Sequence, residues 1–297
     1  MSAFELYVSP SNLFGGGQTP FEAAEFAVVG VPFDLTSTYR RGARLAPPAI
    51  REASLNIETY SFRSKTDFSD LKVHDLGNLH TSNNVKKTLA NLEETVKDLI
   101  GAEKVPVLLG GEHTITLGAA RALGREKLAV ISFDAHLDLR HTYSGTAVNH
   151  TTFMRRLNEQ VKPEVIVEVG TRAVCREELQ YAEASGIQYY ATNLREKHDL
   201  EAVIREVVRL IEPCKSVYLT VDMDVLDPAF APAVQNPEPN GLSSQSLLAV
   251  VSQLCDKRVA ILDLVEVAPP YDHGVTAIQA ARLLFEALCC ISKARES

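Results

Sequence analysis

The chain has few of the features that mark exported or disulfide-stabilised proteins. Its 297 residues include no tryptophan and 5 cysteines. An odd, scattered set of cysteines with no C-x-x-C pair is not typical of a disulfide framework. The N-terminus also lacks a basic segment followed by an apolar one, which an export signal requires. We therefore expect reduced thiols and a cytoplasmic protein.

Long runs of one charge and long apolar segments are also missing. The chain has 30 basic and 38 acidic residues and a net charge of -8, with no block of five or more like charges. This balance argues against a nucleic-acid partner. Charged residues or glycine interrupt every apolar stretch before the roughly 18 residues that a membrane span needs. We expect no membrane association.

What the chain does have is a repeated alternation of apolar runs and helical patterns. Runs rich in Val, Ile and Leu lie near positions 27, 105, 128, 165, 216 and 259. Continuous rather than alternating apolar runs are typical of strands covered on both faces, as in a parallel sheet. Helical spacing predicts helices over 85–99, 200–211, 247–254 and 277–291, with Ser243 as the N-cap of the third. The pattern predicts one α/β domain over residues 1–297 with a doubly wound sheet.

Three of the predicted strands end in clusters of potential metal ligands. Ligands of open α/β sheets bind beyond the carboxyl ends of the strands. The clusters are His113 in GGEH, Asp134, His136 and Asp138 in FDAHLD, and Asp222 and Asp224 in VDMDVLD. In extended chain, side chains two residues apart share a face at a spacing of about 6.5 Å. We therefore expect each cluster to converge on one site.

The charge of these clusters indicates which ligand they hold. Four buried carboxylates repel one another unless cations compensate them, and two divalent ions balance four negative charges. Carboxylate and imidazole ligands without a thiolate favour Mn²⁺. A lone Asp-x-Asp is more often a turn or a cap, so the prediction rests on the combination of clusters. Asp227 precedes a proline and is expected to anchor a loop. Glu112 is expected to be structural, because it points away from His113 in extended chain.

Motifs along nearly the whole chain resemble the ureohydrolase family of arginases, agmatinases and formimidoylglutamases. They include GVPFD at 30, LLGGEHTITLG at 108, FDAHLDLR at 133, VDMDVLDPAFAP at 221 and LVEVAPPYD at 264. The resemblance implies a three-layer α/β/α sandwich, a trimeric or hexameric assembly and two Mn²⁺ ions bridged by hydroxide. It implies six metal ligands, of which Asp138 and the second Asp pair are shared or bridging: His113, Asp134, His136, Asp138, Asp222 and Asp224.

The resemblance also implies a reaction and roles for further residues. Hydroxide would attack the guanidinium carbon, and the metals and Asp138 would stabilise the intermediate before urea and an amine separate. Glu266 would hold the guanidinium through two parallel N–H bonds. His150 would protonate the leaving amine, as a histidine with a pKa near 6.5 can. His141 is a rival for that role.

The motifs PEPNGLS and VEVAPPYD resemble agmatinase more than arginase, so agmatine, which yields putrescine and urea, is the leading substrate. Two features leave alternatives open. Relatives commonly have Gly-Thr-Gly-Thr at the substrate entrance, where this chain has Ala, Val, Gln and Asn236 at 233–236. Arg140 would favour a carboxylate tail if it faces the substrate, and otherwise forms an ion pair. Guanidinobutyrate, arginine, a formimino compound and a catalytically silent metal-binding oligomer are the alternatives. A deacetylase of related fold, with one zinc, has too few carboxylates.

Overall fold

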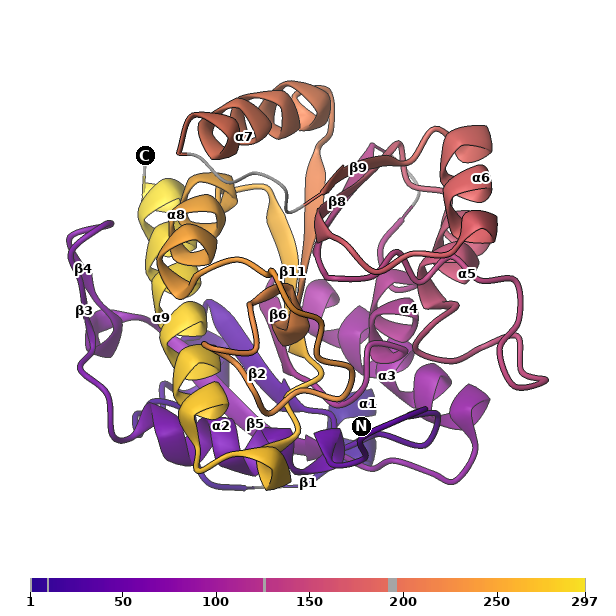
Figure 1. The fold of residues 1–297 in the computed structure, drawn as a ribbon. Helices are drawn as coiled ribbons and strands as arrows, with labels where there is room; N and C mark the ends of the chain where they lie inside the picture. The colour runs from indigo at the N-terminus through magenta and orange to yellow at the C-terminus, as the bar shows by residue number, and fades with distance from the viewer. Residues whose placement is uncertain (1, 10, 125–126, 192–196, 297) are drawn as a thin grey trace.

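The central element is one large, mostly parallel sheet (Figure 1). The computed structural model describes residues 2–9, 11–124, 127–191 and 197–296, and within these ranges nine strands form this sheet. In spatial order they are β1 (Val8–Ser9), β5 (Val73–Leu79), β2 (Phe26–Gly30), β6 (Val105–Leu109), β11 (Val259–Val265), β10 (Ser216–Asp222), β7 (Leu128–Phe133), β8 (Val165–Thr171) and β9 (Gln188–Ala191). All neighbouring pairs are parallel except β1 with β5. The predicted sheet is confirmed.

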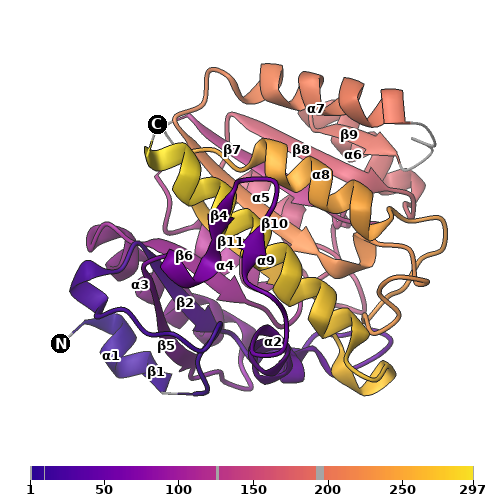
Figure 2. The ribbon, with the colours of Figure 1, turned by 90° about the vertical axis from the view of Figure 1, so that its left-hand side faces the viewer.

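Helices cover both faces of the sheet, which confirms the three-layer α/β/α arrangement (Figure 1). One layer contains α2 (Ala46–Ser54), α7 (Lys197–Ile211), α8 (Ser244–Leu254) and α9 (Val275–Glu296). The other contains α1 (Ala3–Tyr7), α3 (Val85–Gly101), α4 (Ile115–Ala120), α5 (Phe153–Gln160) and α6 (Arg176–Ser185). A hairpin of β3 (Tyr60–Ser61) and β4 (Thr66–Asp67) lies across α9, as Figure 2 shows.

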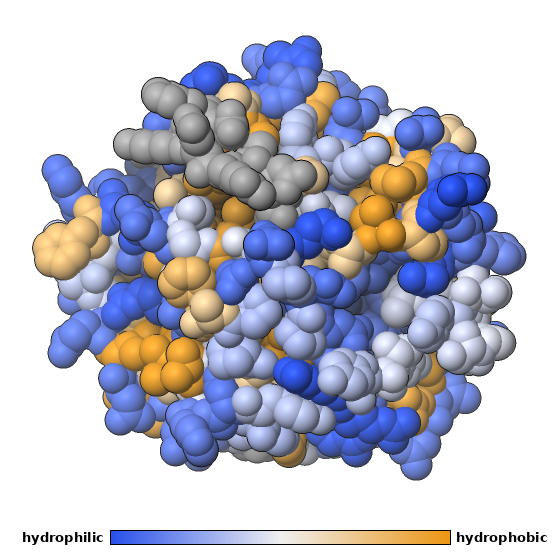
Figure 3. Space-filling model, viewed as in Figure 1, coloured by the Kyte–Doolittle hydropathy of each residue, from blue (hydrophilic) through white to orange (hydrophobic). Residues whose placement is uncertain are grey.

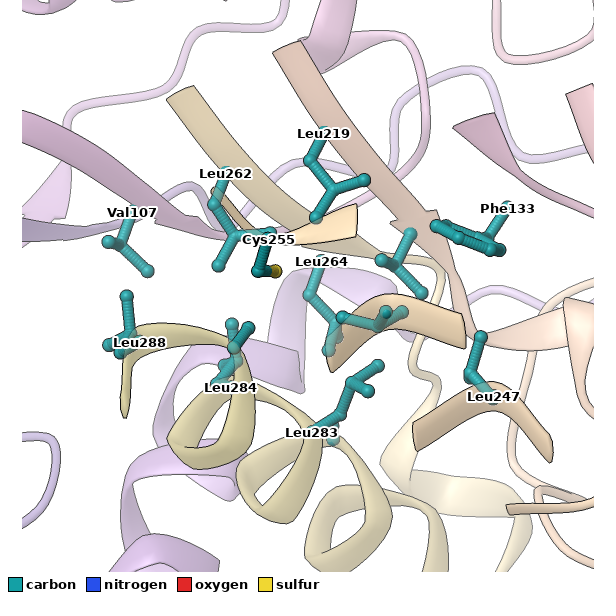
Figure 4. Close-up of a cluster of buried hydrophobic side chains, with 14 of the residues drawn as sticks. Val107, Phe133, Leu219, Leu247, Cys255, Leu262, Leu264, Leu283, Leu284 and Leu288 are labelled. Carbon is teal, nitrogen blue, oxygen red and sulfur yellow. The ribbon is translucent and has the colours of Figure 1, made fainter. Parts of the chain in front are cut away.

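The strands are apolar on both faces because each face packs against a helical layer. In β2, Phe26 and Val28 belong to one core cluster, whereas Ala27 and Val29 belong to the other. Figure 4 shows the first cluster, in which leucines of α9 meet leucines of β10 and β11. Burying one such side chain contributes about 1.5–3 kcal/mol. Core burial therefore explains the continuous apolar runs of the sequence.

The apolar character of α9 has the same cause. By length and composition this helix could cross a membrane, with a mean hydropathy of 1.5 in its most apolar window, but 78% of that window is buried inside the protein. The face in Figure 3 is mostly hydrophilic, with apolar side chains scattered in small groups. The hydropathy of α9 therefore reflects its place in the core.

All four predicted helices are present, and α9 extends beyond the predicted 277–291 at both ends. Ser243 caps α8, since its Oγ accepts the N–H of Ser246 at 3.1 Å. Several elements escaped prediction, among them α2, α5, α6 and β5. Strand β5 alternates buried and half-buried residues, because it lies next to the edge strand β1. Its sequence VHDLGNL therefore lacks a continuous apolar run.

Candidate metal centre and active site

The candidate site lies at the carboxyl ends of four neighbouring central strands. His113 follows β6, Glu266 follows β11, Asp222 ends β10, and Asp134 follows β7. These strands are adjacent in the sheet in the order β6, β11, β10, β7. Because they are parallel, their carboxyl ends share one edge of the sheet. Residues more than a hundred positions apart in the sequence therefore meet there.

The two glycines before Glu112 permit close packing at this edge. A Cβ at Gly110 would lie 2.7 Å from the carbonyl oxygen of Leu264, and one at Gly111 would lie 2.7 Å from that of Val31. Real Cβ atoms do not approach backbone so closely, and a larger residue would push the segment away from β11 and the loop after β2. The Gly-Gly pair thus explains why His113 can reach the centre of the site.

Side chains of five of the six predicted ligands come together in two ligand groups. The ligand atoms of His113, Asp134 and Asp222 lie within 4.8 Å of one another, and so do those of Asp134, His136 and Asp224. His113 Nδ1 is 2.9 Å from Asp134 Oδ2 and 3.2 Å from Asp222 Oδ2. His136 Nδ1 is 3.4 Å from Asp134 Oδ1 and 3.1 Å from Asp224 Oδ2. Each oxygen of Asp134 thus faces a different group.

Asp134, rather than Asp138, is the carboxylate common to both groups. Asp138 Oδ2 lies 3.7 Å from His113 Nδ1, on the side of the first group. The segment 134–138 is not extended as the spacing argument assumed, because β7 ends at Phe133 and Asp138 has a φ of 50°. Asp224 lies in a 3₁₀ turn, Met223–Val225, where its N–H donates to Asp222 Oδ1. The side chains converge through these bends.

The electrostatics of the groups fit divalent cations. Burial, reinforced by Asp134, raises the pKa of Asp138 well above its usual range, and burial together with Asp224 does the same to the pKa of Asp222. Burial opposes protonation of His113, but Asp134 outweighs it and raises the pKa of that imidazole to about 9. Although Asp134 Oδ2 lies 2.9 Å away, the buried His113 Nδ1 makes no well-aligned hydrogen bond among the described residues. Crowded carboxylates and an unsatisfied imidazole nitrogen are the donor set that a metal would complete.

Buried hydroxyl groups contact the His113 imidazole on the side that faces away from the other ligands. Its Nε2 lies 2.9 Å from Thr220 Oγ1, which leaves Nδ1 directed at the site. Next to Thr220 in the adjacent strand, Asp263 Oδ2 accepts hydrogen bonds from Tyr218 Oη at 2.6 Å and from Thr116 Oγ1 at 2.7 Å. Such contacts fix the tautomer and the orientation of a ligating imidazole.

We expect Thr220→Val to weaken Mn²⁺ binding by about 10- to 100-fold, because it removes the acceptor of His113 Nε2–H while keeping a β-branched side chain in the strand. Calorimetric titration of metal-free protein with Mn²⁺ measures the change. Ser132→Ala is the matched control, since Ser132 carries a buried hydroxyl in register with Thr220 on β7. Equal Mn²⁺ affinity in wild type and Thr220→Val would contradict this role.

Glu266 and His150 lie beside the two ligand groups. Glu266 adopts a φ of 67°, which turns its carboxylate back toward β6, where Oε1 accepts the N–H of His113 at 2.6 Å. His150 Nδ1 is 3.9 Å from that oxygen, and His150 Nε2 is 3.1 Å from Thr38 Oγ1. His141, the rival of His150, is exposed and contacts Arg156. The structure therefore places His150, and not His141, next to Glu266.

The expected pKa of His150 is corrected. Burial, together with positive charge on His136 and His113, lowers the pKa of His150 to about 4. A neutral imidazole at pH 7 can accept a proton first and donate it afterwards. Any role as an acid must therefore begin with proton uptake within the site.

This shift predicts acid sensitivity. The pKa of His150 is about 4 in the folded protein and about 6.5 in the unfolded chain, so the unfolded chain takes up a proton first as the pH falls. The contribution of neutral His150 to the free energy of unfolding is therefore complete above pH 6.5. It is lost as the pH falls toward 4, by up to about 3 kcal/mol. Chelator-treated wild type should therefore lose more unfolding free energy than His150→Asn between these pH values. Urea unfolding at several pH values measures the difference, and parallel curves would refute the shift.

Glu112 and Asp227 have the structural roles that the sequence predicted. Glu112 is buried and accepts the N–H of Thr36 at 2.7 Å and the hydroxyl of Thr114 at 2.7 Å. Thr36 Oγ1 in turn accepts the N–H of His150 at 3.2 Å, so Glu112 helps to position that histidine. Asp227 accepts the N–H groups of Ala229 and Gly241 and closes the loop between them.

An open cavity of about 350 Å³ leads to the metal groups. Its lining includes Thr38, Tyr39, His136, Asp138, Arg140, Tyr143, Asn236 and Glu238. Arg140 does face this cavity, but its Nε lies 4.0 Å from Glu178 Oε2 and its guanidinium packs over the Tyr143 ring. Asn236 also lines this cavity. Thr38 and Glu238 also line the cavity but were not predicted, because neither belongs to a ligand-spacing pattern.

Fold and site together define a class: α/β/α hydrolases with carboxylate–imidazole metal groups at the carboxyl edge of a parallel sheet. The profile of the Arginase family matches residues 24–290. The chain therefore belongs to the arginase family, and it is an enzyme of the ureohydrolase type, most similar to agmatinases.

Individual relatives agree with this assignment. The agmatinase of Bacillus anthracis is 35% identical over 90% of this chain and 92% of its own length. The N(1)-aminopropylagmatine ureohydrolase of Thermococcus kodakarensis is 36% identical over 92% of both chains. The crystal structure of the agmatine ureohydrolase of Thermoplasma volcanium superposes with a TM-score of 0.89, at 34% identity and 97% coverage of both chains.

Proposed function

We propose that this enzyme hydrolyses agmatine to putrescine and urea in the cytoplasm, with two Mn²⁺ ions in each subunit of a trimer or hexamer. The observation that carries the proposal is the convergence of two carboxylate–imidazole groups, joined by Asp134, next to Glu266 and His150. His113, Asp134, Asp138 and Asp222 would hold one ion. Asp134, His136 and Asp224 would hold the other, which Asp222 would share as the family resemblance implies.

When bound, the two ions supply an acidified water and hence a hydroxide nucleophile at neutral pH. The carboxylate of Glu266 orients the guanidinium carbon toward the metal groups. Burial raises the pKa of Glu266 to about 8, so this carboxylate gains more from a cationic partner than an exposed one would. Asp138, at the mouth of the site, stabilises the protonated nitrogens as the carbon becomes tetrahedral.

His150 moves the proton. As a neutral imidazole it takes up a proton released in the attack and returns it to the leaving amine. Thr38 Oγ1 contacts His150 Nε2 and also lines the cavity, so it provides a hydrogen-bonded path between the imidazole and the amine. This second transfer restores the neutral imidazole, and putrescine and urea then leave the site.

Agmatine is favoured over guanidinobutyrate by the charges of the cavity. The ammonium end of agmatine needs an anionic surrounding, and Glu238 lines the cavity with its side chain 40% exposed. Arg140, which would repel an ammonium, is partly neutralised by Glu178. N1-aminopropylagmatine, the substrate named for the Thermococcus relative, carries a longer cationic tail and is a further candidate substrate.

A urea-release assay with Mn²⁺-loaded protein tests the proposal. Agmatine, N1-aminopropylagmatine, arginine, guanidinobutyrate, guanidinopropionate and formiminoglutamate are compared, with Asp138→Asn as the inactive control. We expect the highest kcat/KM for agmatine. Arginine preferred tenfold over agmatine would overturn the substrate assignment alone, whereas no urea from any guanidino compound would overturn the proposed reaction.

A further inference from the structure

The loop 233–236, which departs from the family pattern, is hydrogen-bonded to the segment that follows β11 and carries Glu266. Val234 forms an antiparallel bridge with Val267, and the N–H of Ala268 donates to the carbonyl of Ala233 at 2.7 Å. The N–H of Ala233 in turn donates to Thr276 Oγ1 at 3.0 Å. These bonds fix the backbone of the two residues directly before Gln235. Its side chain is thereby directed at Glu266.

Gln235 contacts the carboxylate that the reaction requires. Its Nε2 donates a hydrogen bond to Glu266 Oε2, while Glu266 Oε1 accepts the N–H of His113. Gln235 is completely buried, and Glu266 is 3% exposed. The other polar atom of the amide, Gln235 Oε1, is buried without a hydrogen-bond partner among the described residues. One half of this amide is therefore satisfied by Glu266, and the other half has no partner.

The open cavity ends short of this contact. Asn236, the residue after Gln235, lines it together with His136 and Asp138. Neither Gln235 nor Glu266 is among its described lining residues. Gln235 and Glu266 are thus both buried behind the lining of the space that a substrate enters.

A primary amide presents a planar NH₂ donor to a carboxylate, as one arm of a guanidinium does. We propose that Gln235 occupies the guanidinium subsite at Glu266 and competes with the substrate for it. This inference rests on the proposed function. The guanidinium must displace the amide, and contacts of the substrate tail with the cavity compensate for the lost hydrogen bond. The amide therefore weakens the binding of every guanidino compound, and a small guanidine without a tail has no further contacts that compensate for it.

Two variants test the competition, so that a folding defect in one does not decide the outcome. In Mn²⁺-loaded Gln235→Ala and Gln235→Gly, we expect the KM for agmatine to fall by about tenfold, the equivalent of one hydrogen bond to a charged group, with a much smaller change in kcat. Calorimetric titration with guanidinium chloride at millimolar, non-denaturing concentration should show a similar gain in affinity for the tailless cation. Gln253→Ala, an exposed glutamine on α8, is the matched control and should match wild type in both measurements.

Equal or weaker binding of guanidinium by both folded variants would overturn the competition, and so would a higher KM, since Gln235 would then be a favourable substrate contact. The calorimetric arm does not depend on turnover. If wild type and variants release no urea from any guanidino compound, the proposed reaction fails, while tighter guanidinium binding by the variants would still support the competition at Glu266.

Discussion

Asp134→Asn is expected to abolish urea release, by at least about 10³-fold, and to remove both Mn²⁺ ions. Each oxygen of Asp134 faces a different ligand group, so one substitution weakens both ion sites. Without the ions, the pKa of the attacking water returns from about 7 toward about 15.7, and hydroxide is no longer available at neutral pH. Metal content after gel filtration and urea release from agmatine measure the two effects.

Asp70→Asn is the matched control, because Asp70 is exposed and lies outside both ligand groups. It should retain wild-type metal content and activity. An Asp134→Asn protein that keeps one tightly bound ion would show that Asp134 serves a single site. The two groups would then not be joined as the distances indicate.

Glu266→Gln is expected to lower kcat/KM for agmatine by about 10³-fold while leaving both ions bound. The substitution removes the buried carboxylate that pairs with the guanidinium of the substrate. It also places an NH₂ group next to a donor, either the N–H of His113 or the amide of Gln235. Steady-state kinetics together with metal analysis separate this effect from metal loss.

The exposed Glu183→Gln on α6 is the control for the charge change and should behave as wild type. If Glu266→Gln instead lost its metals and kept its KM, the role of Glu266 would be to support His113. Binding of the guanidinium would then fall to another residue.

The sequence was most informative where polar ligand residues recur directly after the apolar runs that form strands. Continuous apolar runs predict the central parallel strands, because buried strands need apolar side chains on both faces. Polar clusters directly after those runs predict where His113, Asp134 and Asp222 lie, since parallel strands end at one edge. Charge balance alone then points to cations.

Features that depend on tertiary contacts could not be predicted from the sequence. The positive φ values of Asp138 and Glu266 and the hydrogen bond of Gln235 to Glu266 follow from how loops from distant parts of the chain pack together. The same holds for Asp134 as the shared carboxylate, because the spacing argument assumed an extended segment where the chain bends. The low pKa of His150 likewise requires knowledge of its burial.

Titration of metal-free protein with Mn²⁺, with urea release from agmatine recorded at each step, shows whether the enzyme is a two-metal hydrolase. Two ions per chain balance the four carboxylates of Asp134, Asp138, Asp222 and Asp224. We expect urea release to rise with added Mn²⁺ and to reach its maximum at two ions per chain. A maximum at one ion per chain, or urea release that does not depend on metal, would contradict this expectation.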